Sequence, residues 1–138
     1  MRVHYGKSLM RCIHCGKPYR KKLGRIMFKS RILGSVKTPV IKYDQCSGCG
    51  DRLLDMSTAT ILTDFIADRE QKFVDSLPIG AFISLKHAAE LLNMTPNKFR
   101  RNPRIQRGFI LSSKIAGRRF YHMKSVRCFK KTGDGRKI

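Results

Sequence analysis

Apolar and polar positions repeat with different periods along the chain, and the change of period divides it into stretches. Residues 25–43 alternate roughly in twos around Gly34, which predicts a small antiparallel hairpin or three-stranded sheet. Residues 57–77 instead repeat apolar side chains at helical spacing, with Ser57 suited as the N-cap and Leu77-Pro78 ending the run. The apolar positions of this connector helix are Ile61, Leu62, Phe65, Ile66, Phe73 and Val74.

The pattern in residues 84–103 predicts two short helices joined by a tight turn. Ser84 caps the first, whose apolar positions include Ala88 and Ala89, and Asn93 follows where the turn needs left-handed backbone. Thr95 caps the second helix, residues 96–102, with Pro96 in its first turn, and Pro103 stops it. This arrangement predicts a helix-turn-helix whose second helix is sized for the major groove of DNA. That helix turns Phe99 inward and presents outward Asn97, Lys98, Arg100 and Arg101.

The remainder predicts a hairpin, a last helix and a loose end. The hairpin pairs residues 108–111 with 118–121 and turns at Ala116-Gly117, and the helix covers about residues 124–129. The tail, residues 130–138, lacks apolar periodicity, so we expect it to fray. Sequence alone leaves open whether the connector helix packs on its own chain or joins two copies through residues 57–75.

Four of the five cysteines form two pairs with two residues between the members. A pair at this spacing can direct both sulfurs at one ion, and two pairs complete a tetrahedral four-sulfur zinc site. The predicted ligands are Cys12, Cys15, Cys46 and Cys49. Disulfides and thioredoxin-like redox chemistry are the alternatives, disfavoured by a cytosolic setting and by the second, similarly built pair. A full ligand set without an open position indicates a structural ion.

The first cysteine region resembles the YgiT-type zinc finger, the N-terminal domain of MqsA-type antitoxins. The resemblance rests on the spacing of the two pairs and on the phrase Cys46-Ser-Gly-Cys-Gly-Asp51, followed by a helix. It covers about residues 10–75. If it extends to function, it implies that the zinc domain caps a toxin and that the rest of the chain represses the operon.

Composition adds a partner class. The 138 residues include 30 Lys and Arg against 9 Asp and Glu, a formal net charge of +21. Residues 1–56 hold 13 basic and 3 acidic side chains, residues 57–76 hold 2 and 4, and residues 77–138 hold 15 and 2. Charge of one sign at this density indicates a polyanion such as nucleic acid, because Lys and Arg release counterions from phosphates.

Residues 82–129 resemble the excisionase and MerR-type winged helix-turn-helix. The phrases that carry the resemblance are Ala88-Ala-Glu-Leu-Leu-Asn93 and Gly117-Arg-Arg-Phe-Tyr121. The resemblance implies that Lys114, Arg118 and Arg119 lie on or beside the wing and meet phosphates or the minor groove. Together with Asn97, Lys98, Arg100 and Arg101, they form the predicted DNA-binding set.

The predicted fold class is α+β. A small four-cysteine zinc-ribbon β domain (1–56) precedes a connector helix (57–77) and a winged helix-turn-helix domain with a frayed basic tail (78–138). The expected function is that of a sequence-selective regulator of transcription, of bacterial or phage type, that binds double-stranded DNA. The alternatives are an MqsA-like antitoxin, and an accessory factor that binds RNA or RNA polymerase through the zinc domain.

An enzyme is not expected. The sequence has no phosphate-cradling Gly-rich loop with a Lys, and His4, His87 and His122 stand isolated from acidic residues that would orient them. No apolar run is long enough to cross a membrane and the first residues do not lead into a signal-peptide core, so we expect a cytoplasmic protein.

Overall fold

The computed structural model describes residues 2–3 and 11–138, so His4 and part of the predicted first domain lie outside the described residues. The chain divides into two compact units. The first contains Gly34–Asp68 and the described residues before Arg31, and the second contains Arg69–Ile138 together with Arg31–Leu33. Helix α1 (Met56–Asp75) therefore begins in the first unit and ends in the second, where the sequence predicted a separate connector.

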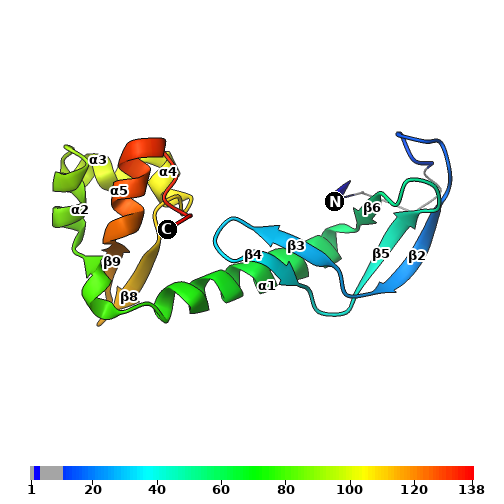
Figure 1. Cartoon of the computed structure of the whole chain (residues 1–138), viewed down its shortest axis with the longest axis horizontal. Coiled ribbons are helices and arrows are strands. Elements are labelled where there is room, and N and C mark those ends of the chain that lie inside the picture. The colour runs from blue at the N-terminus through cyan, green and yellow to red at the C-terminus, as the bar shows by residue number, and fades with distance from the viewer. Residues whose placement is uncertain (1, 4–10) are drawn as a thin grey trace. The chain divides into compact units, whose positions relative to one another are not determined.

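The first unit is built on small sheets (Figure 1). One sheet has the strand order β1-β6-β5-β2, with β1 parallel to β6 and the other neighbours antiparallel. The second sheet is the hairpin of β3 and β4. The strand bounds are β1 Arg2–Val3, β2 Tyr19–Gly24, β3 Met27–Ser30, β4 Gly34–Lys37, β5 Ile41–Cys46 and β6 Arg52–Leu54.

Thr38 closes the base of the β3–β4 hairpin. Its backbone N–H donates to the carbonyl of Ile26 at 2.9 Å, and its Oγ1 accepts from the Ile26 N–H at 3.0 Å. Both residues are buried, so these bonds are shielded from water. The alternating pattern of residues 25–43 thus forms strands as predicted, with β2 as an addition that the pattern did not indicate.

Helix α1 begins one residue before the predicted N-cap. Asp55, and not Ser57, caps it, because its Oδ1 accepts from the backbone N–H of Thr58 at 2.7 Å and from the Ser57 hydroxyl at 3.0 Å. Of the predicted apolar stripe, Leu62, Ile66 and Val74 are buried. Ile61 and Phe73 are exposed, which leaves the predicted homodimer through residues 57–75 a prediction.

The second unit is mixed helix and sheet. A three-stranded sheet in the order β7-β9-β8 supports three short helices and one longer one. After a 3-10 turn at Ile79–Ala81, the bounds are β7 Phe82–Ile83, α2 Leu85–Leu91, α3 Pro96–Arg101, α4 Pro103–Gln106, β8 Ser112–Ile115, β9 Arg118–His122 and α5 Met123–Thr132. In the part of the chain that the structure describes, no helix combines the length and apolar character that a bilayer span requires.

Local signals in this unit place α2 and α3 correctly. Ser84 Oγ accepts from the N–H of His87, and Thr95 Oγ1 accepts from the N–H of Lys98, both at 3.2 Å. Asn93 has a φ of 53° between the two helices, the left-handed conformation that Asn tolerates better than most residues. The N-caps and the turn residue are therefore confirmed.

Three details differ from the prediction. The hairpin strand is residues 112–115 and not 108–111, while the turn at Ala116-Gly117 is confirmed by φ values of 52° and 78°. Pro103 does not only stop α3, because Asn102 Oδ1 accepts from two backbone N–H groups and begins the one-turn helix α4. The tail was predicted to fray, but it is held to the rest of the unit at Gly135, whose N–H donates to the Phe109 carbonyl at 2.7 Å.

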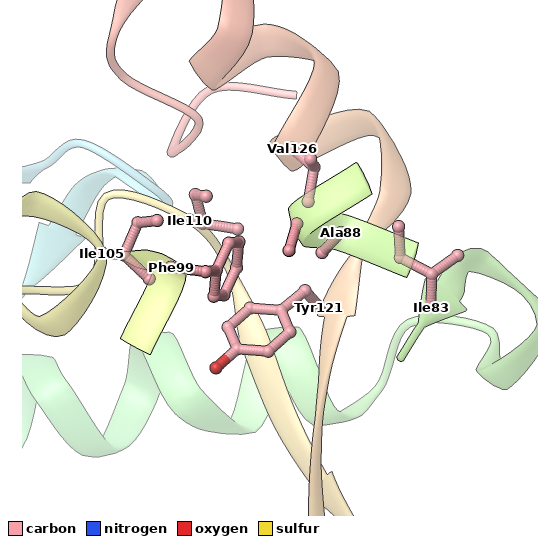
Figure 2. Close-up of a cluster of buried hydrophobic side chains, with 8 residues drawn as sticks. Ile83, Ala88, Phe99, Ile105, Ile110, Tyr121 and Val126 are labelled. Atoms are coloured by element: carbon pink, nitrogen blue, oxygen red, sulfur yellow. The ribbon is translucent and has the colours of Figure 1, made fainter. Parts of the chain in front are cut away.

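One cluster of buried side chains forms the core of the second unit. Phe99 of α3 is fully buried, and its ring meets that of Tyr121 edge-on with 4.7 Å between the ring centroids (Figure 2). The small residues Ala88 and Ala89 of α2 are fully buried as well, which lets α3 approach closely. This packing sets which face of α3 remains in solvent. The cluster comprises Ile83, Ala88, Ala89, Phe99, Ile105, Ile110, Tyr121 and Val126.

Candidate metal centre and cationic surface

The two cysteine pairs converge in the first unit. All four Sγ atoms lie within 4.8 Å of one another, and the closest approaches are Cys15 to Cys46 at 3.2 Å and Cys12 to Cys49 at 3.5 Å. Four thiolates at tetrahedral positions around one zinc ion are about 3.8 Å apart, given a Zn–S bond of about 2.3 Å. The cluster can therefore hold a metal ion, and the four predicted ligands are the residues that meet.

Tight turns bring each pair together. Gly16 and Gly50 follow their pairs with φ of 73° and 78°, a conformation that glycine adopts without strain. Their backbone N–H groups close the turns on the carbonyls of Cys12 and Cys46 at 2.7 and 3.2 Å. Both turns thereby aim their sulfurs at the same point.

Backbone amides support two of the sulfurs. The N–H of His14 donates to Cys12 Sγ and the N–H of Gly48 donates to Cys46 Sγ, each at 3.4 Å. His14 thus contributes its backbone to the cluster, and its exposed imidazole is not among the grouped ligand atoms. Such N–H donors stabilise thiolate charge, which is the form that binds a metal.

The thiol pKa values differ within the cluster. Burial opposes ionisation of Cys12, but hydrogen bonds from the amides of His14 and Cys15 outweigh it and lower the pKa to about 6. At Cys49, a backbone hydrogen bond from Asp51 favours the thiolate, but the hydrogen bond with Cys12, burial and the other thiols raise the pKa to about 12. Four sulfurs this close do not all ionise unless a cation lies between them.

Gly48 lies close against the cluster. A Cβ at this position would lie 3.0 Å from Cys15 Sγ and 2.7 Å from Cδ of Lys17. Next to the cluster, Tyr19 donates its hydroxyl hydrogen to Asp51 at 2.8 Å, and burial followed by this hydrogen bond raises the pKa of Tyr19. Cys12 and Cys46 are buried while Cys15 and Cys49 are exposed, so the chain covers one side of the cluster.

The second unit presents cations on α3. Asn97, Lys98, Arg100 and Arg101 are all exposed, as predicted, because Phe99 faces the core. A side chain from α4 bonds to the end of this helix: Gln106 Nε2 donates to the Arg100 carbonyl at 2.9 Å. The four polar side chains of α3 are therefore accessible to a partner, and the backbone at Arg100 is hydrogen-bonded to α4.

The hairpin of β8 and β9 adds further cations on the same unit. Lys114, Arg118 and Arg119 are exposed, and the Arg119 guanidinium donates to Ser112 Oγ at 2.7 Å. Burial raises the pKa of the Tyr121 phenol, and the charges of Arg119 and Arg100 act against that rise. The charges of an α3 arginine and a β9 arginine thus act on the same phenol.

Two cations escaped the sequence prediction. Arg104 and Arg107, on and just after α4, are exposed and extend the basic set of α3 along the chain. The sequence contains a signal for them: residues 91–133 include no Asp or Glu, so every charged residue of this stretch, these two arginines included, is basic. Pro103 predicts the end of one helix, and the sequence pattern does not indicate that α4 begins at the same residue.

Comparisons with protein-family models, curated proteins and solved structures find no match for this chain.

Proposed function

We propose that the chain is a sequence-selective, double-stranded-DNA-binding regulator of transcription, of bacterial or phage type, with a zinc ion held by its four cysteines. In this proposal α2 and α3 act as a helix-turn-helix and the β8–β9 hairpin acts as its wing. The observation that carries it is α3 itself, which buries Phe99 completely and exposes two arginines, a lysine and an asparagine on the opposite side.

The chemistry of these side chains suits base recognition in the major groove. A guanidinium such as that of Arg100 or Arg101 can donate two hydrogen bonds to O6 and N7 of guanine, and the Asn97 amide can pair with adenine. Lys98 and the hairpin cations suit phosphates, which fix the position of the protein without reading sequence. The absence of acidic residues between 91 and 133 removes a source of repulsion toward the DNA backbone.

Zinc is the proposed ion because of its ligands. Thiolate sets of four favour Zn²⁺ or an iron–sulfur cluster, and the closed four-sulfur geometry around one point fits a single ion. Metal analysis of the purified chain should give about one zinc per chain. Iron with the absorption of a cluster would overturn the assignment.

The DNA proposal is tested by selecting bound sequences from random duplex DNA and footprinting the enriched site. We expect Arg100→Ala plus Arg101→Ala to abolish the selective footprint, with about 1–3 kcal/mol of discrimination lost per base contact. Lys130→Ala plus Lys131→Ala, in the last turn of α5, removes the same charge from the same unit and serves as the control. An unchanged footprint with the arginine variant would refute the role of α3.

A further inference from the structure

The first unit carries a group of cations that neither the cysteine cluster nor the proposed duplex interface uses. Residues directly paired across antiparallel strands project from the same face of a sheet. In the register of the first unit, Arg20 pairs with Gln45, Lys22 pairs with Tyr43, and Gln45 pairs in turn with Arg52. These five residues therefore share one face, which we call the cationic sheet face.

The β2 side of this face is open to solvent. Arg20 and Lys22 are exposed, and Tyr43, Gln45 and Arg52 are half-buried. Ile41 and Leu54, which belong to the same face, are buried. None of its residues on β2, β5 and β6 is acidic, because Asp44 belongs to the opposite face by strand alternation. The face thus combines two exposed cations, a half-buried third and one half-buried aromatic ring.

Tyr43 lies among these cations. The Arg52 guanidinium carbon is 5.8 Å from the centroid of the Tyr43 ring. The Tyr43 hydroxyl reaches toward β2, where it lies 4.0 Å from the point that a Cβ on Gly24 would occupy. The Arg52 guanidinium thus lies over the Tyr43 ring, and its Nε is buried without a hydrogen-bond partner within the described residues.

We propose that the cationic sheet face binds single-stranded nucleic acid, with a base stacked on Tyr43 and phosphates bound by Arg20 and Lys22. Cations beside an aromatic ring on a sheet are the two elements that single-strand binding needs, since every base has a face that stacks. A duplex keeps its base faces within the stack, so it can engage the cations but not the ring. This proposal does not rest on the duplex function of the second unit.

The first test compares the two faces of the same sheet. The probes are labelled single strands of about 15 nucleotides, oligo-dT and oligo-rU, and a duplex of equal length serves as competitor. Arg20→Ala plus Lys22→Ala should weaken single-strand binding about tenfold and reduce the salt slope by about 1.4, at about 0.7 per phosphate contact. Lys21→Ala plus Lys42→Ala, which removes the same charge from the opposite face, should leave both nearly unchanged.

The second test reports on stacking. The chain contains no tryptophan, so Tyr43→Trp introduces a single tryptophan at the proposed contact, which can be excited apart from the remaining tyrosines. Its fluorescence should be quenched as either oligonucleotide is added, and Tyr43→Leu should weaken binding about tenfold, the loss of one stacked base. Circular dichroism and metal content confirm that each variant is folded.

The outcomes separate this proposal from the duplex function. Three results would each overturn the single-strand proposal. The first is equal weakening by the Arg20/Lys22 and Lys21/Lys42 variants, and the second is unquenched fluorescence of the Tyr43→Trp variant. The third is a duplex that competes as well as a single strand. The Arg100→Ala plus Arg101→Ala variant should keep single-strand binding while it loses the selective footprint. Preference for oligo-rU over oligo-dT would identify RNA as the ligand, and the reverse would identify single-stranded DNA.

Discussion

At the scale of single residues, the geometry of the metal cluster depends on Gly48, which is not itself a ligand. Gly48 lies between two cysteines of the cluster, and any side chain there would press on Cys15 Sγ and on Lys17. The Lys17 side chain can move away, but the sulfur is held by its own turn. Glycine is therefore required at this position by space and not by backbone conformation.

We predict that Gly48→Ala lowers zinc affinity by about tenfold or more, the range found when groups that support metal ligands are changed. The measurement is a competitive titration against a chromophoric chelator. Gly24→Ala is the matched control, because its Cβ would meet only the Tyr43 hydroxyl at an ordinary 4.0 Å. Equal zinc affinities for the two variants would show that the turn around Gly48 yields to an added methyl group.

His122 is a buried histidine whose Nδ1 has no hydrogen-bond partner in the part of the chain described here. Its ring meets Phe82 edge-on at 5.3 Å between centroids. Burial lowers its pKa below the ordinary 6.5, and the charge of Lys124 lowers it further. The folded protein therefore keeps His122 neutral at pH values where the unfolded chain already binds a proton.

The second unit should accordingly lose stability in acid. Because the folded pKa is the lower one, the contribution is fully present above pH 6.5 and declines as the pH falls through that value toward the folded pKa. His122→Phe should flatten this decline, which urea midpoints between about pH 8 and pH 5 would show. A decline of the same steepness in the variant would assign it to other groups.

At the scale of elements, the sequence predicted most of what local chemistry decides. Ser84 and Thr95 begin helices because their hydroxyls accept backbone N–H groups only a few residues away. The hairpin strand was misplaced because Ile110 and Leu111 form an apolar run, yet both are buried in the core as part of a loop. The two-residue turn at Ala116-Gly117 requires the paired strand to end at Ile115, a constraint stronger than the apolar pattern.

Strand β2 was not predicted, because its burial pattern differs from that of a half-buried strand. Its central residues are all exposed, so it shows no alternation of buried and open positions. Its place is set by pairing with β5, which ends at Cys46 of the metal cluster. The cysteine spacing predicted the cluster fully, but the faces of the sheet depend on the register, which spacing alone does not specify.

Ser125 joins α5 to Leu111, just before β8, and to Gly135 of the C-terminal tail. Its Oγ accepts from the Leu111 N–H at 2.8 Å and donates to the Gly135 carbonyl at 2.7 Å, with the residue fully buried in α5. Ser125→Ala leaves both backbone groups without this partner, so we expect a loss of about 1–3 kcal/mol in urea unfolding. Ser76→Ala, an exposed hydroxyl bonded to the Phe73 carbonyl, should cost far less because water replaces it. Similar losses would contradict the bridging role of Ser125.

At the scale of the whole molecule, the two units have different sources of stability. The second unit has a continuous apolar core around Phe99 and Tyr121. Among its described residues, the first unit buries apolar side chains on short strands, between strands and on α1, and its buried cysteines are also its cluster ligands. A domain of this size gains much of its folding free energy from a bound ion, because the ligand set forms only when the chain is folded.

Metal removal should therefore unfold the first unit and spare the second. In the chelated chain, we expect amide NMR signals of residues 11–54 to collapse toward unfolded shifts while those of residues 82–132 persist. Binding should divide in the same way, with the footprint assigned to α3 retained and single-strand binding by the cationic sheet face lost. Readdition of zinc should restore the lost signals and the lost binding together. A chain that keeps all its signals under strong chelation would refute a structural metal, and collapse of both sets would show that the core around Phe99 depends on the first unit.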